Sequence, residues 1–312
     1  MSAHEVAPPT NAVRPRPASW LDVRERGTLL GIRALALVCR VLGRSVARGV
    51  VALVAFHYTL FDVRARRVSR AYLARVHPRV TTRLVFAHVL RFCQVSLDRI
   101  FLVMGRTKYF EVTHTGHELL VKQRESGHGA VLLGAHLGSF EAMRIKAEQY
   151  RLPINALGFF RNAQMVNSVL EQLDPQTNAR VIAIDTGGVD FVLDVKDRVE
   201  RGELIAILGD RVARGARSVT VDFLGGRARF PTGPFLLAAT LRCPIYLVFG
   251  LHRAPNHYDL YCEPFTDLLV LPRKAREEAL QEAVQRFAVR LEHYVRLAPD
   301  NWFNFFDFWE TP

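Results

Sequence analysis

A histidine and a glutamate, His136 and Glu141, stand close together in the stretch GAVLLGAHLGSFEAMR, which ends at Arg144. These residue types could supply a general base, with the imidazole of His136 oriented by the carboxylate of Glu141. Five positions apart on one continuous helix, the two side chains would diverge by about 140°. They can meet only if the chain turns between them, and Gly138 permits such a turn. The alternative is a buried histidine that satisfies local hydrogen bonds, with Glu141 as an ordinary helix residue.

The residues on either side of His136 predict a strand followed by a helix. The run 130–134 is uninterrupted, apolar and ends in glycine, which is typical of a strand buried in a parallel sheet. After the turn, Ser139 suits a helix N-cap, and the carboxylate of Glu141 suits the first helical turn. His136 is then expected at the carboxyl end of a strand, where open α/β sheets place their chemistry.

Strands and helices alternate regularly along the rest of the chain. We expect strands at 109–116, 153–160, 179–185, 204–208, 245–251 and 258–263, and helices at 162–173, 188–200 and 274–297. The stretch 218–230 predicts a hairpin that turns at Gly225-Gly226, and Thr232 is a candidate cap for the helix beginning at Gly233. This alternation predicts an α/β fold, with a mostly parallel sheet and helices on both of its faces.

Polar residues follow three of the expected strands. They are His136, then Arg161 with Asn162, then Asp210 with Arg211. Because the carboxyl ends of neighbouring parallel strands meet at one edge of a sheet, we expect these side chains to line a single cleft if the strands are neighbours.

Composition limits the classes of function. The 312 residues carry a net charge of +12, with a pI near 10.1, which predicts an anionic partner such as anionic lipid, an acidic carrier or nucleic acid. The four cysteines lack CxxC spacing, which suits a reducing compartment, and His114, His117 and Glu118 form no H-E-x-x-H pattern, so no metal is expected. Nucleotide-binding glycine loops and a G-x-S-x-G elbow are also absent from the sequence.

The amino-terminal third combines basic charge with apolar surface. Residues 1–19 predict a disordered tail without the apolar core of a secretory signal. Residues 20–105 predict a helical, membrane-associating region, in which arginines at 33, 40, 44 and 48 share one helical face opposite leucines and valines. A second basic cluster at 64–70 could meet anionic head groups. The alternative is a pair of core helices with solvated arginines.

The remaining residues, 106–312, are expected to form the α/β domain. Its ending, 299–309, is unusually rich in aromatic residues. Such a segment either closes the core or lies at a membrane interface, and we expect it to close the core beside the cleft.

The motif around His136 resembles the His-x4-(Asp/Glu) block of the lysophospholipid acyltransferase superfamily, particularly the branch of the lipid A late acyltransferases (lauroyl and myristoyl transferases). The resemblance extends over most of the chain, including the sequences FRN at 160–162, GDR at 209–211, FLGG at 223–226 and FPTG at 230–233. It implies that His136 is the base and Glu141 its partner. The substrate-binding residues that it implies are Arg161, Asn162, Asp210, Arg211, Gly225, Gly226, Thr232 and Gly233.

The resemblance also implies an activity and a location. The implied protein is an enzyme at the cytoplasmic face of the bacterial inner membrane. It moves a fatty acyl group from acyl carrier protein or coenzyme A to a hydroxyl of a lipid or glycolipid. No cofactor is expected beyond this acyl donor. Two features depart from lipid A enzymes: Asp210-Arg211 replaces an Asp-Gln pair, and the aromatic ending is more similar to acyltransferases of aryl-polyene pigment pathways.

Two other functions are compatible with parts of the sequence. A lipid or thioester hydrolase could use the same histidine and glutamate. A basic nucleic-acid-binding protein would account for the charge alone. Because the arginines concentrate on apolar helices and not on a polar recognition face, we expect no nucleic acid partner.

Overall fold

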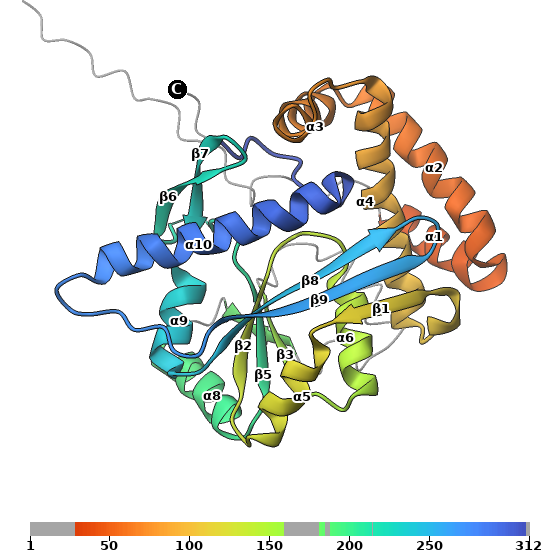
Figure 1. Ribbon diagram of the computed structural model, residues 1–312. Coiled ribbons are helices and arrows are strands. Elements are labelled where there is room, and N and C mark those ends of the chain that lie inside the picture. Colours follow the sequence, from red (N-terminus) through yellow and green to blue (C-terminus); the bar gives the residue numbers. More distant parts are fainter. Residues whose placement is uncertain (1–28, 159–180, 185–187, 214, 310–312) are drawn as a thin grey trace, which may run out of the picture.

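A seven-stranded sheet forms the centre of the protein, whose computed structural model describes residues 29–158, 181–184, 188–213 and 215–309 (Figure 1). The strand order is β1-β9-β8-β2-β5-β3-β4, and each neighbouring pair is parallel except β8 with β9. The strands are β1 (Glu111–Thr115), β2 (Ala130–Gly134), β3 (Ile154–Gly158), β4 (Val181–Ala183), β5 (Leu204–Leu208), β8 (Ile245–Arg253) and β9 (His257–Thr266). The predicted α/β class with a mostly parallel sheet is confirmed.

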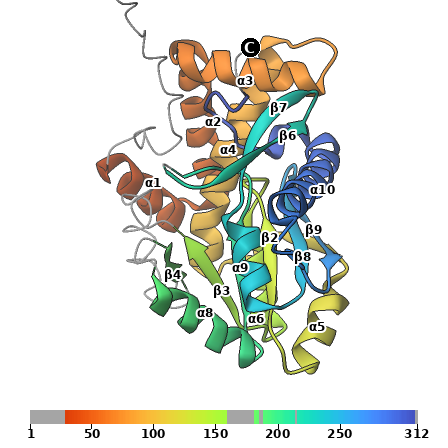
Figure 2. The same cartoon turned by 90° about the vertical axis from the view of Figure 1, so that its left-hand side faces the viewer.

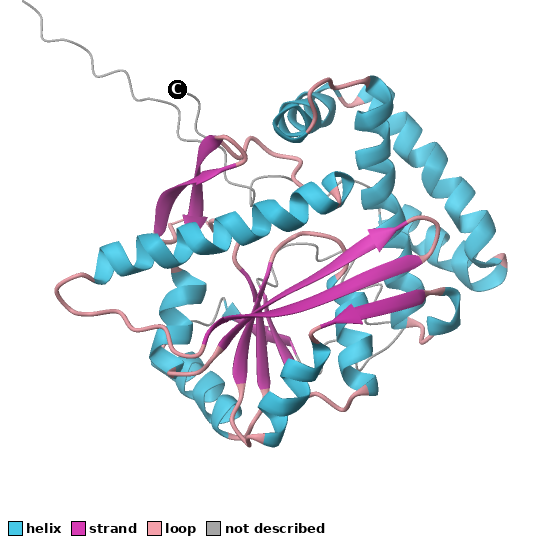
Figure 3. Ribbon diagram, in the orientation of Figure 1, coloured by secondary structure: helices cyan, strands magenta, loops and turns pink. Residues whose placement is uncertain are grey.

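Helices cover both faces of this sheet (Figure 3). Along β2, Val131 and Leu133 pack in the main core with α8 (Val189–Glu200), α9 (Gly233–Leu241) and α10 (Arg276–Leu297). The intervening Leu132 packs on the opposite side, in a cluster with residues of α5 (His117–Glu125) and α6 (Phe140–Gln149). Because successive side chains of a strand point to opposite faces, this continuous apolar run supplies both cores.

Among the described residues, four α-helices precede the sheet: α1 (Leu29–Val41), α2 (Gly43–Phe61), α3 (Val63–Val76) and α4 (Thr82–Val103). Figures 1 and 2 both place them together at one end of the molecule. In the part of the chain that the structure describes, no single helix has the length and hydropathy to cross a membrane. Of these described helices, only α2 and α3 taken together have enough length and hydropathy, and the chain bends by 92° between them. The expected tail, 1–19, lies outside the described residues.

The predicted single face with four arginines is divided, because the chain breaks between α1 and α2 and leaves Arg40 exposed on α1. Within α2, Arg44 and Arg48 face the protein. Arg44 donates from Nε and Nη2 to the buried carboxylate of Asp98, at 3.0 and 3.1 Å. Arg48 donates to the carbonyl of Pro255 at 2.7 Å. The opposite side of α2 is apolar and open, with Leu53 exposed to 73% and Phe56 to 55%. The alternative of core helices with solvated arginines therefore does not describe Arg44 and Arg48.

The carboxyl-terminal segment closes the main core, as predicted. After α10, a short 3-10 helix, η4 (Pro299–Asn301), leads to Trp302, which is 1% exposed. The Trp302 ring packs edge-on against Tyr72 of α3 and Phe223 of the β6–β7 hairpin, with centroids 5.1 and 5.3 Å away. The hairpin strands are β6 (Ser218–Phe223) and β7 (Gly226–Pro231), which lie beside α10 (Figure 2). They turn at Leu224-Gly225, one residue earlier than predicted, because Gly226 already pairs with Phe223.

Candidate active site

His136 follows β2 directly, and a tightly held turn separates it from α6. Gly138 adopts a φ of +70°, and a Cβ there would lie 1.9 Å from the carbonyl oxygen of Gly250 on β8. The amide of Ser139 donates to that same carbonyl at 2.7 Å. The Ser139 hydroxyl then caps α6 by accepting from the amide of Ala142 at 3.1 Å. The predicted glycine turn and serine cap are both confirmed.

The ring of His136 is hydrogen-bonded to Asp210. Its Nδ1 lies 2.8 Å from Oδ1 of Asp210, and its backbone amide donates to Oδ2 at 3.1 Å. The two residues meet because β2 and β5 are neighbouring parallel strands, and Gly209 continues their pairing by donating to the carbonyl of Gly134 at 2.9 Å. Two of the three expected polar strand ends therefore share one site, whereas Arg161 and Asn162 lie outside the described residues.

Asp210 is fully buried, and several hydrogen-bond donors stabilise its negative charge. Burial alone raises the pKa of this carboxyl, but His136, Arg211 and the indole N–H of Trp302 outweigh burial and lower the pKa to about 2. The Trp302 Nε1 donates to Oδ2 at 3.1 Å. Asp210 is consequently a carboxylate at neutral pH, and it can accept the Nδ1–H of His136.

His136 itself is kept neutral. Burial and the positive charge of Arg211 lower the pKa of the imidazole, and they outweigh the opposing effect of Asp210. With Nδ1–H donating to Asp210, the lone pair resides on Nε2. The side chain is 29% exposed, so this ring is not enclosed in the core. This arrangement can accept a proton from a substrate.

Glu141 does not have the partner that we expected. Its carboxylate is 5% exposed and lies between Arg99 of α4, at 3.3 Å, and Arg144, one turn further along α6. The carboxylate at Nδ1 of His136 is that of Asp210. The difference arises because sheet pairing places Asp210 beside His136, whereas the first turn of α6 directs Glu141 toward α4.

The other predicted substrate-binding residues that the structure describes lie at three places. Arg211 adjoins the site, where its Nη2 donates to the carbonyl of Phe303 at 2.6 Å. Gly225 lies in the turn of the β6–β7 hairpin and Gly226 begins β7, where a Cβ on Gly226 would meet the Arg75 guanidinium at 2.4 Å.

Thr232 and Gly233 lie between β7 and the start of α9. The Thr232 hydroxyl donates to the carbonyl of Arg217 at 3.2 Å and makes no side-chain cap on α9. The predicted cap is therefore wrong. The α9 helix begins at Gly233, and Pro234 follows in its first turn, where the fixed φ of proline is suited to the helix.

Residues 17–311 match the family model for bacterial lipid A biosynthesis acyltransferases. The chain belongs to this family. No curated protein matches it. Membership indicates an acyltransferase that acts on lipid, and the predicted lipid A late acyltransferase-like branch is confirmed.

Trp302 is the residue of this candidate site that the sequence pattern did not single out. It lies 92 positions after Asp210, so local spacing carries no sign of the contact. The aromatic composition of the ending was the available signal, and it indicated the neighbourhood of the cleft without indicating the bond to Asp210.

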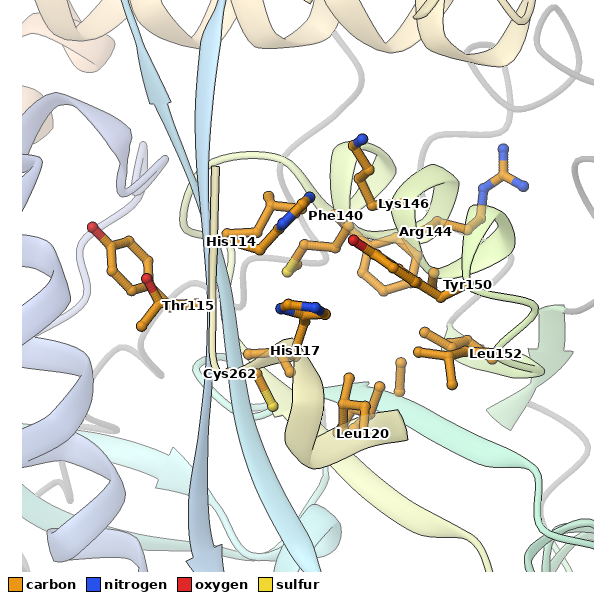
Figure 4. A pocket seen from close by; sticks show the side chains of 18 residues that line it. His114, Thr115, His117, Leu120, Phe140, Arg144, Lys146, Tyr150, Leu152 and Cys262 are labelled. Atoms are coloured by element: carbon orange, nitrogen blue, oxygen red, sulfur yellow. The ribbon is translucent and has the colours of Figure 1, made fainter. Parts of the chain in front are cut away.

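A small apolar cavity of about 70 Å³ lies apart from His136, under α6 and against α5 and the sheet. Figure 4 shows His114, His117 and Tyr150 gathered around it, with Lys146 and Arg144 carried on α6. The His117 and Tyr150 rings stack at 5.1 Å. His114 and His117 are thus wall residues of this cavity.

Proposed function

We propose that the protein transfers a fatty acyl group from an acyl thioester, of acyl carrier protein or coenzyme A, to a hydroxyl of a lipid or glycolipid. The observation that carries this proposal is the bond between Nδ1 of His136 and the buried carboxylate of Asp210. It directs the basic Nε2 of a neutral imidazole toward the reaction, as general-base catalysis of acyl transfer requires.

In the proposed reaction, Nε2 of His136 accepts the proton of the acceptor hydroxyl while that oxygen bonds to the thioester carbonyl carbon. The carbon–sulfur bond then breaks, the electron pair leaves with sulfur, and the imidazolium returns the proton to the thiolate. Asp210 stabilises the imidazolium between these steps. A well-placed base of this kind contributes roughly 10²–10⁴ in rate.

The developing oxyanion needs hydrogen-bond donors, which we propose come from the first turn of α6 and from Arg161. Two amides of this turn are already engaged, since Ser139 donates to Gly250 and Ala142 donates to the Ser139 hydroxyl. The amides of Phe140 and Glu141 are therefore the proposed backbone donors.

Glu141 is proposed to act in this site through the two guanidinium groups that it holds, those of Arg99 and Arg144. Such cations suit the phosphate of a pantetheine-containing donor. The further residues proposed to bind donor or acceptor are Asn162, Arg211, Gly225, Gly226, Thr232 and Gly233.

We further propose that α1–α3 lie on the cytoplasmic face of the bacterial inner membrane. Their outer surface carries large exposed apolar side chains, which are Leu37, Val41, Leu42, Val46, Leu53, Phe56, Leu60, Phe61 and Val63. Exposed arginines of α3, including Arg64, Arg67 and Arg70, follow directly. Apolar surface beside basic charge is typical of binding to anionic bilayers. The aromatic ending, similar to that of aryl-polyene-pathway enzymes, leads us to propose a lipid hydroxyl without restricting it to lipid A.

The products of the reaction distinguish this proposal from hydrolysis by the same histidine. The purified protein would be incubated with a radiolabelled long-chain acyl thioester and vesicles of bacterial lipid extract. We expect label in an acylated lipid, and none above background with His136→Ala, whose folding is checked by circular dichroism. Label accumulating only as free fatty acid would instead establish a hydrolase, and full transfer by His136→Ala would refute His136 as the base.

A further inference from the structure

Residues 301–303 lie alongside the turn that carries His136, and an isolated antiparallel bridge pairs the two segments. The amide of Gly138 donates to the carbonyl of Asn301 at 2.9 Å, and the amide of Phe303 donates to the carbonyl of His136 at 3.0 Å. Leu137 and Trp302 are thereby paired. The backbone of the turn that carries His136 is therefore held by the carboxyl-terminal segment on one side and by Gly250 on the other.

The side chain of Trp302 reaches from this segment to the carboxylate behind the histidine. Oδ2 of Asp210 accepts two N–H groups, one from the indole of Trp302 and one from the backbone of His136, both at 3.1 Å. Oδ1 is then directed to Nδ1 of the His136 ring at 2.8 Å. Without the indole, the carboxylate would lose a charge-assisted hydrogen bond and one of the contacts that set its rotation.

Trp302 is itself rigidly placed. Its carbonyl accepts a hydrogen bond from Nε2 of the buried His88 at 2.9 Å, and its ring is packed by Tyr72, Phe223 and Phe308. The neighbouring Asn301 is fully buried and bonds through its side chain to both the amide and the carbonyl of His252, at 2.6 and 3.1 Å. The donor that Trp302 presents to Asp210 is consequently preorganised before any substrate binds.

We propose that Trp302 is a positioning residue of the acyltransferase site, which acts through Asp210 to fix the orientation and basicity of His136. This inference rests on the proposed role of His136 as the base. The indole N–H donates to Asp210 and partly neutralises the charge of the carboxylate, so the carboxylate stabilises the imidazolium form of His136 less strongly. Removing the N–H strengthens the pull of Asp210 on the imidazolium, and the His136 ring then holds its proton to higher pH.

The test compares Trp302→Phe with Trp309→Phe in the full chain. Trp309 is a matched control, because it lies in the same aromatic cluster and its indole donates to a backbone carbonyl, that of Phe223, at 3.0 Å. We expect Trp302→Phe to lower kcat for acyl transfer from a long-chain acyl-coenzyme A about tenfold, with little change in KM. Trp309→Phe should retain the activity. Equal losses in both variants would show that Trp302 serves only packing.

Two further measurements separate positioning from a general loss of structure. Nuclear magnetic resonance titration of the His136 ring requires no substrate, and Trp302→Phe should move its midpoint to higher pH. Within the described part of the chain, Asp210 and Arg211 are charged groups that act on this ring, and both are unchanged in the variant. An unchanged or lowered midpoint would overturn the proposal. A raised midpoint in a protein without transferase activity would support the positioning role while refuting the proposed function.

A double-mutant cycle with Asp210→Asn completes the test. If Trp302 acts through the carboxylate, Trp302→Phe should add little to the loss of kcat that Asp210→Asn already causes. Losses that multiply independently would contradict action through Asp210.

Discussion

Oδ1 of Asp210 lies 2.8 Å from Nδ1 of His136 although the two residues are 74 positions apart in the sequence, whereas Glu141, five positions from the histidine, lies between Arg99 and Arg144. The carboxylate that orients the ring is thus supplied by a neighbouring strand. This relationship assigns different roles to the two buried acids of the site, and the roles can be tested separately.

The first prediction concerns these two carboxylates. Asp210→Asn should reduce kcat by at least about 100-fold, because an amide neither stabilises the imidazolium nor enforces the tautomer with Nδ1–H. Glu141→Gln is the matched substitution, and it should leave the nitrogen-15 signals of the His136 ring as in wild type. Kinetics and ring spectra of both variants provide the measurement. If the ring signals of His136 shift from their wild-type positions in Glu141→Gln but not in Asp210→Asn, Glu141 orients the ring.

The second prediction concerns the pH dependence of the rate. Burial and Arg211 lower the pKa of His136 below its ordinary value of 6.5. Since the base works in its neutral form, kcat/KM should be retained at pH 6.5 and fall only as the pH drops through the lowered pKa. Arg211→Gln removes a positive charge near the ring and should move this acid limb to higher pH. An acid limb above pH 6.5 in the wild type would be inconsistent with the site described.

The third prediction concerns the glycine turn. Gly138→Ala adds a Cβ at a φ of +70°, 1.9 Å from the carbonyl oxygen of Gly250, so the backbone that carries His136 must move. Gly127→Ala is the control, because its φ is +74° and its surroundings are open within 4 Å. We expect the control to lose about 1 kcal/mol of stability and keep its activity. Gly138→Ala should lose most transferase activity, and wild-type rates in this variant would show that the turn tolerates displacement.

The fourth prediction concerns the ion pair that joins α2 to α4 within the amino-terminal helices. The carboxylate of Asp98 is 1% exposed and pairs with Arg44, while Tyr258 donates to it at 3.0 Å. Asp98→Ala leaves a buried guanidinium without its counter-ion, which should lower the free energy of unfolding by roughly 3–5 kcal/mol. Asp307→Ala breaks an exposed pair with Arg67 of similar length, and it should cost less than about 1 kcal/mol. Urea denaturation of both variants measures the difference, and equal costs would contradict it.

The fifth prediction concerns the apolar surface of α2. Leu53→Glu combined with Phe56→Ser should weaken sedimentation of the protein with anionic vesicles by about tenfold or more, because two large apolar contacts are lost. Val289→Glu alters a residue of α10 that is 57% exposed, and it should leave vesicle binding unchanged. Equal binding by the double variant and the wild type would place the membrane contact elsewhere.

Much of the fold follows from local patterns in the sequence. Apolar runs bounded by glycine and proline predicted the strands of the sheet, and the hydroxyl of Ser139 was correctly expected to cap α6. These features depend on residues within a few positions of one another. The helix start at Gly233 shows the limit, because Thr232 has the right side chain for a cap but donates to Arg217 instead.

The sequence by itself determined the α/β class, the position of His136 at the end of a strand, and the turn at Gly138 that precedes α6. Only the tertiary structure decided which carboxylate meets the imidazole, because the pairing of β2 with β5 joins positions 136 and 210. It also decided that the indole of Trp302 donates to Asp210, and that Arg44 of α2 faces inward and donates to Asp98. Periodicity identifies the faces of a helix or strand, but only packing determines what each face contacts.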